Sequence, residues 1–117
     1  MIECTLNLKT KPFDAILKGK KRIEIRAYKS QYEMLKPKDC LIVTNVDTNR
    51  KISCTILRIT HYSSVRELLH KEGMETTLSN INDIEEGIKS IENIRDYKER
   101  IKKNGVFAIE IGDPILQ

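Results

Sequence analysis

Apolar and polar residues alternate along several short stretches of the chain, and this period of two predicts β-strands with one buried face. The first stretch, IECTLNL at residues 2–8, places an apolar side chain at every second position. Alternation of this kind, or a short apolar run bounded by turn residues, returns four more times. The predicted strands cover residues 2–8, 21–26, 40–46, 51–62 and 106–111.

Other stretches repeat apolar residues every three or four positions, which predicts helices. Residues 10–19 and 63–73 each have the pattern of one helix that ends at a glycine. Thr10 and Ser64 are their candidate N-terminal caps. The longer apolar repeat over 84–101 predicts either one kinked helix or two short ones.

The predicted order of elements is β, α, β, β, β, α, α, β. Strands do not alternate with crossover helices, so a doubly wound parallel sheet is disfavoured. The order indicates an α+β fold with a curled, mostly antiparallel sheet. The length of 117 residues suits one domain with one core, and we assign residues 1–117 to a single domain.

The second predicted strand, KRIEIR, carries an unusual set of side chains. Alternation directs Ile23 and Ile25 into the core. Arg22, Glu24 and Arg26 then project together from the opposite face. That face is either a solvated surface with weak ion pairs or a site where basic groups converge on an anion.

Charge is unevenly distributed along the chain, whose formal net charge is +4. Residues 9–29 hold eight Lys or Arg and two acidic residues, whereas residues 72–92 hold six acidic residues and one Lys. This distribution predicts a polarised surface that steers an anionic ligand. The alternative is that a lysine-rich sequence produces a basic stretch by chance.

The composition excludes several classes of protein. Apolar residues make up 39% of the chain and charged residues 32%, which indicates a globular protein and not a disordered one. No apolar run approaches the ~20 residues that cross a bilayer. The first residues lack the pattern of a signal peptide. We therefore expect a soluble, cytoplasmic protein.

The cysteines and histidines have no spacing that predicts a metal site. Cys4, Cys40 and Cys54 are far apart and lie in strand-like stretches, so we expect free, buried thiols. His61 and His70 show no metal-ligand spacing either. We expect no cofactor.

The basic residues around the second strand are candidate ligands for phosphate or another anion. Lys20 and Lys21 would act as point charges, and Arg22 adds a further charge. Arg26 could bind an anion through two N–H groups. Tyr28, in the loop after the strand, could stack on a base, or it could pack against its own protein.

Glu24 is the single carboxylate in this basic strand. It would pair with Arg22 or Arg26 and hold the geometry of that arginine. A carboxylate can also accept a hydrogen bond from the amino edge of cytosine or adenine. Lys21 has a second possible role, because neighbouring positive charges favour the neutral amine, which can act as a base or a nucleophile.

The segment GKKRIEIR resembles the signature of ASCH domains, a branch of the PUA-like superfamily. The residues that fill the signature are Gly19, Lys20, Lys21, Glu24 and Arg26. The segment YEMLKPKDCLIV resembles the family's Lys-Pro-Gly-Asp turn into a strand, with Lys38 in place of the glycine. The resemblance continues through the later segments and covers nearly the whole chain.

This resemblance implies a small, mostly antiparallel PUA-like β-barrel flanked by helices, with a ligand cleft beside the signature strand. It also implies RNA or nucleotide ligands. One similar branch hydrolyses 4-acetylcytidine with a Lys, a Thr and a Glu. Carried over to this chain, the Lys is Lys21, the Thr position is Glu24, and the Glu is Glu72. Glu24 is a departure, because an acceptor replaces a hydroxyl donor.

The leading hypothesis is an RNA- or nucleotide-binding domain whose basic cleft lies on the GKKRIEIR strand. The alternative is an enzyme, either a hydrolase of a modified nucleoside or a ribonuclease, with Lys21, Glu24 and Glu72 as catalytic residues. A third hypothesis is a protein-interaction domain. The expected partner is an RNA, a nucleotide or a modified nucleoside and not a membrane, and the sequence leaves the oligomeric state open.

Overall fold

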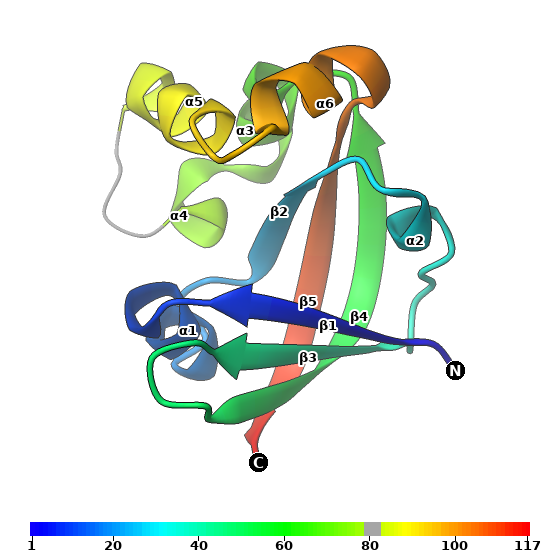
Figure 1. The fold of residues 1–117 in the computed structure, drawn as a ribbon, viewed down its shortest axis with the longest axis vertical. Helices are drawn as coiled ribbons and strands as arrows, with labels where there is room; N and C mark the ends of the chain where they lie inside the picture. The colour runs from blue at the N-terminus through cyan, green and yellow to red at the C-terminus, as the bar shows by residue number, and fades with distance from the viewer. Residues whose placement is uncertain (79–82) are drawn as a thin grey trace.

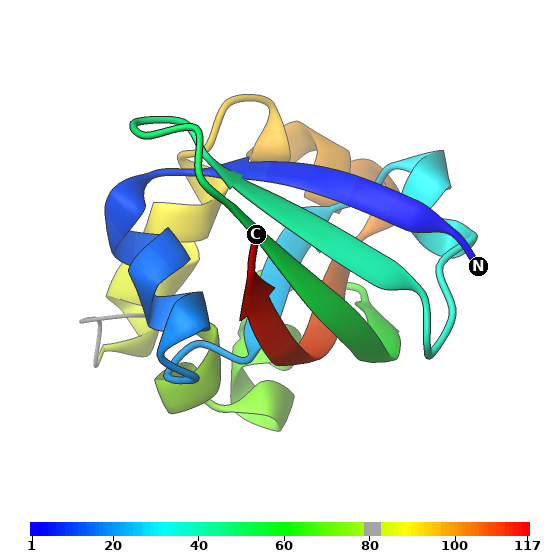
Figure 2. The same cartoon turned by 90° about the horizontal axis from the view of Figure 1, so that it is seen from below.

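The computed structural model describes residues 1–78 and 83–117. Their five strands form one curled sheet, a half-barrel, shown in Figures 1 and 2. The strands are β1 (Glu3–Leu8), β2 (Ile23–Ala27), β3 (Cys40–Asn45), β4 (Lys51–Tyr62) and β5 (Val106–Leu116). Their order across the sheet is β1-β3-β4-β5-β2, so β1 and β2 are the two edges.

The sheet is mostly antiparallel, as the sequence predicted. Only β1 and β3 pair in parallel, and the other three pairs are antiparallel. The pairing of β4 with β5 shifts register twice, between Ser53 and Thr55 and between Ile56 and Arg58. Such irregularities bend a strand and increase its twist, so they help to curl the sheet. The curl leaves β1 and β2 unpaired with each other, and the sheet is therefore a half-barrel rather than a closed barrel.

Within the described residues, six helices pack around this sheet. They are α1 (Thr10–Leu17), α2 (Ser30–Glu33), α3 (Val65–Glu72), α4 (Met74–Thr77), α5 (Ile84–Glu92) and α6 (Tyr97–Asn104). In Figure 1, α3, α4, α5 and α6 gather at one end of the molecule. The contacts of α4 and α6 with β2, and of α3 with β5, place this group against one end of the sheet.

The strands and long helices follow the predicted order, and the predicted repeat over 84–101 forms two helices. The short helices α2 and α4 were not predicted, because four residues hold too little apolar repeat to give a signal. Ser64 caps α3 as expected, since its hydroxyl accepts the N–H of Glu67 at 3.1 Å. Thr10 does not cap α1. Its own N–H donates to Asp47 Oδ2 at 3.1 Å.

The described residues form two apolar cores instead of the single core expected from the length. One lies inside the curl of the sheet and the other between the sheet and the helices. Strand β5 supplies both by alternation, with Phe107 and Ile109 in the first core and Val106 and Ala108 in the second. β5 lies between the two cores and is therefore buried on both faces. Its neighbour β2 packs on the second core with one face and turns its other face toward the inside of the curl.

The turn before β3 holds a residue in a backbone conformation that favours glycine. Lys38 has φ 80°, and its N–H donates to the carbonyl of Ile56 at 2.8 Å. A residue with a Cβ is disfavoured in this region by about 1–2 kcal/mol, whereas glycine adopts a positive φ about as readily as a negative one.

We predict that Lys38→Gly raises the free energy of unfolding by up to about 1 kcal/mol, because the strain exceeds the chain entropy that glycine adds. Chemical denaturation measures this change. Lys36→Gly is the matched control, since Lys36 lies in the same turn without a positive φ. Lys36→Gly should destabilise the protein, and equal destabilisation by both variants would contradict the prediction.

Candidate functional site

A cleft of about 480 Å³ opens where the curled sheet fails to close, between the end of β1 and strand β2. The helices α1, α4, α5 and α6 also contribute residues to its walls. Its polar and aromatic lining residues include Lys9, Lys21, Glu24, Arg26, Thr77 and Tyr97. Three cations and one carboxylate therefore share a partly enclosed space.

The alternation along β2 explains why its charged residues enter this cleft. Ile23, Ile25 and Ala27 belong to the core beneath the helices. Glu24 and Arg26 must then point the other way, toward the inside of the curl and its open edge. Glu24 is only 3% exposed. The directions of the isoleucines are as predicted, but the alternative of a solvated strand face is wrong for Glu24.

Glu24 lies between two cations. Its Oε1 accepts a hydrogen bond from Arg26 Nε at 3.2 Å, and its Oε2 lies 3.4 Å from Lys21 Nζ. The predicted pairing of Glu24 with an arginine is therefore present, with Arg26 as the partner. Oε2 is buried and has no hydrogen-bond partner within residues 1–78 and 83–117, because the Lys21 contact is an ion pair without hydrogen-bond geometry.

Arg26 keeps its charge in this setting. Burial lowers the pKa of its guanidinium group, but the carboxylate of Glu24 and the hydroxyls of Tyr97 and Tyr32 outweigh burial and raise the pKa above the usual value. Arg26 thus remains a fixed donor at the edge of the cleft. Its position depends on Glu24, as expected for an arginine that a carboxylate orients.

The other predicted ligands lie outside the cleft lining. Lys20 and Arg22 are exposed, and the Arg22 N–H donates to the carbonyl of Thr76 at 3.0 Å, which joins β2 to α4. Tyr28 stacks on Phe107 with ring centroids 6.0 Å apart. The packing alternative therefore describes Tyr28. Tyr97, which the sequence analysis did not single out, is the tyrosine that lines the cleft.

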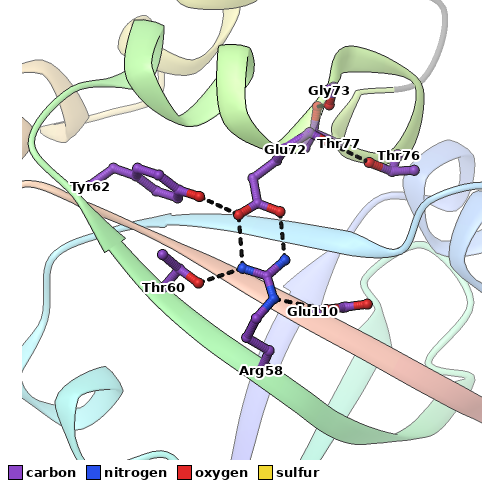
Figure 3. A network of polar contacts seen from close by, with 8 residues as sticks. All are labelled: Arg58, Thr60, Tyr62, Glu72, Gly73, Thr76, Thr77 and Glu110. Carbon is purple, nitrogen blue, oxygen red and sulfur yellow. Dashed lines mark hydrogen bonds and ion pairs between the residues drawn. The ribbon is translucent and has the colours of Figure 1, made fainter.

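Glu72 belongs to a different polar network, shown in Figure 3. Arg58 binds it through two hydrogen bonds, Nη2 to Oε1 at 2.6 Å and Nη1 to Oε2 at 2.9 Å. Tyr62 donates its hydroxyl to the same carboxylate, and Arg58 Nε donates to Glu110 at 3.0 Å. Glu72 does not line the cleft that holds Lys21, so the structure does not bring the three predicted catalytic residues together.

The Arg58–Glu72 network ties the end of α3 to β4. Gly73 follows with φ 85°, and α4 then turns toward the cleft and presents Thr77 to it. The network therefore positions one wall of the cleft from a distance. The sequence held a signal for its strand side, because Arg58, Thr60 and Tyr62 share one face of a long strand by a period of two.

The two buried thiols are poorly suited to nucleophilic chemistry. All three cysteines are free, and Cys4 and Cys54 are buried as expected, whereas Cys40 is partly exposed. Burial, assisted by the nearby Cys40 and Glu24, raises the pKa of Cys54 to about 11. A thiol with this pKa stays protonated at neutral pH.

Over 1–78 and 83–117, no three His, Cys, Asp or Glu side chains gather as metal ligands. The described helices include none that is both long and apolar enough to cross a membrane.

Comparison with known proteins identifies the family. The family model for the ASCH domain matches residues 6–115, which is nearly the whole chain. The chain belongs to the ASCH domain family. The resemblance inferred from GKKRIEIR is thereby confirmed at the level of the family.

Solved structures agree with this assignment. The ASCH chain is 38% identical to the hypothetical protein PH0355, with a TM-score of 0.83 over 97% of this chain and 100% of that one. It is 35% identical to the protein PF0455 from Pyrococcus furiosus, with a TM-score of 0.74 over 97% and 98%. The ASCH protein from Zymomonas mobilis shares the fold at 19% identity, with a TM-score of 0.64 over 97% and 70%. No curated protein gives a significant match.

The Arg58–Glu72 network should make the stability of this ASCH domain sensitive to acid. Hydrogen bonds from Arg58 lower the pKa of Glu72 below its usual 4.5, and Tyr62 adds to this effect while burial opposes it. A carboxylate with a lowered pKa in the folded state stabilises the protein above its unfolded-state pKa. That stabilisation is lost as the pH falls through the folded-state pKa.

We predict that Glu72→Gln lowers the free energy of unfolding by about 1 kcal/mol near neutral pH, because it weakens charge-assisted hydrogen bonds. The gap between variant and wild type should persist down to the unfolded-state pKa near 4.5 and shrink as the pH falls below it. Urea denaturation at several pH values measures it, with Glu75→Gln on the exposed surface of α4 as the control. A gap that is constant with pH would contradict the prediction.

Proposed function

We propose that this ASCH domain binds RNA by taking one nucleotide into the cleft between β1 and β2. The observation that carries the proposal is the open cleft of about 480 Å³ in which Lys21, Glu24 and Arg26 are held together. The volume suits a small ligand site. The charged groups offer both donors and an acceptor, as recognition of a nucleotide requires.

Exposed cations extend this site toward the solvent. Lys9 lines the cleft from the end of β1, and Lys20 and Arg22 are exposed just before β2. These side chains are free to contact the phosphates on either side of a bound nucleotide. The net charge of +4 favours the approach of a polyanion.

Apolar groups on the helical side offer a surface for the base. Ile94 lines the cleft and is 47% exposed, and Tyr97 lies beside it. A base inserted from the open edge would cover Ile94 and contact the ring of Tyr97. This arrangement gives Tyr97 the role of base contact that the sequence analysis gave to Tyr28.

The hydrolase alternative has less support from the geometry. It requires Lys21 and Glu72 in one site, but Glu72 is held by Arg58 and Tyr62 and does not line the cleft. Cleavage of RNA by the same pair meets the same difficulty. We therefore propose binding as the function of the cleft, and not hydrolysis by Lys21 and Glu72.

We predict that single-stranded RNA binds this ASCH domain with an affinity that falls steeply as salt rises from about 50 to about 200 mM. Replacing Lys20 and Arg22 together by Gln should reduce the slope of log affinity against log salt by about 1.4, because each lost phosphate contact removes about 0.7. Fluorescence anisotropy with a labelled RNA measures both values.

Lys71→Gln is the matched control for this experiment. Lys71 is also an exposed cation, but it lies on α3 and not in the segment that leads into β2. Its removal should leave the salt slope unchanged. The proposal fails if RNA does not bind, or if Lys71→Gln reduces the slope as much as the change at Lys20 and Arg22.

A further inference from the structure

The buried carboxylate oxygen of Glu24 is an unusual feature of an open cleft. Oε2 has no hydrogen-bond partner within the described chain, and Glu24 is only 3% exposed. Buried polar atoms in proteins are almost always hydrogen-bonded. Since Glu24 also lines the cleft, its carboxylate is an acceptor that the cleft offers to a ligand N–H.

One donor lies beside each oxygen of this carboxylate. Lys21 Nζ lies 3.4 Å from Oε2 and carries three N–H groups, and Arg26 binds Oε1 through Nε alone. Both residues line the cleft and keep further N–H groups for a ligand. From Lys21 through Glu24 to Arg26, the wall therefore reads donor, acceptor, donor.

A ligand edge that reads acceptor, donor, acceptor complements this wall. Uracil has such an edge, because its ring N–H lies between two carbonyl oxygens. Cytosine places a ring nitrogen lone pair where uracil has the N–H, and that lone pair would face the carboxylate of Glu24. Adenine turns an amino donor toward one flanking cation and a ring nitrogen lone pair toward Glu24, so it offers neither the central N–H nor the two carbonyl acceptors. Guanine places an amino donor against one of the flanking cations.

We propose that the cleft selects uracil through its imide edge, with the ring N–H donating to Glu24 Oε2 and the two carbonyls accepting from Lys21 and Arg26. This inference rests on the proposed function and adds the identity of the base. It assigns Glu24 a direct contact with the ligand, beyond its contact with Arg26.

Calorimetric titration of the wild-type protein with nucleoside monophosphates tests the proposal. Uridine monophosphate should bind at least about fivefold more tightly than the cytidine, adenosine or guanosine nucleotides, the lower bound for discrimination by paired base contacts. The 3-methyluridine nucleotide should bind more weakly than uridine monophosphate by a similar factor. Its methyl group replaces the hydrogen of the ring N–H that would donate to Glu24.

The variant Glu24→Gln tests the role of the carboxylate directly. Its amide can donate as well as accept, so the preference for uridine over cytidine monophosphate should fall to about one or reverse. Glu33→Gln is the matched control, because Glu33 is an exposed carboxylate of α2 outside the cleft lining. This control should retain the wild-type preference.

The outcomes separate this inference from the proposed function. If the cytidine, adenosine or guanosine nucleotide binds the wild type as tightly as the uridine nucleotide, the choice of uracil is overturned while RNA binding stands. Unchanged affinity for the 3-methyluridine nucleotide overturns it in the same way, even if Glu24→Gln does not fold. If neither nucleotides nor RNA bind, both proposals fail.

Discussion

A carboxylate held between two cations inside a curled sheet is the interaction on which the rest of the site depends. Removing charges from water is costly, so Glu24 can be buried only because Lys21 and Arg26 accompany it. The arrangement is possible because β2 has the helices on one face and the open inside of the curl on the other. The polar face of β2 is therefore partly enclosed by the fold and still lines a cleft that is open to a ligand.

The opposite wall of the cleft depends on a second charged network. The bidentate pair of Arg58 and Glu72 fixes the end of α3 on β4, and α4 continues from there to the cleft. The N–H of Arg22 then joins β2 to α4. The two walls thus meet through a short path of hydrogen bonds, which gives Glu72 a structural role even though it lies outside the cleft lining.

The sequence predicts the local parts of this protein better than the relations between them. Alternation located the strands and directed Ile23 and Ile25 correctly, because the period of two is a local property. It did not predict the burial of Glu24, because burial depends on where β2 lies in the sheet order and on a second core formed by distant helices. The grouping of Glu72 with Lys21 rests on the resemblance to the 4-acetylcytidine branch, and a resemblance between sequences does not show which cleft a side chain faces.

The most direct test of the account is to locate the bound RNA by NMR, with isotope-labelled protein titrated with single-stranded RNA. The account predicts that amide shifts concentrate at residues that line the cleft, such as Lys21, Glu24 and Arg26, with smaller changes around Arg58. Shifts concentrated around Arg58 and Glu72, with the cleft undisturbed, would contradict it.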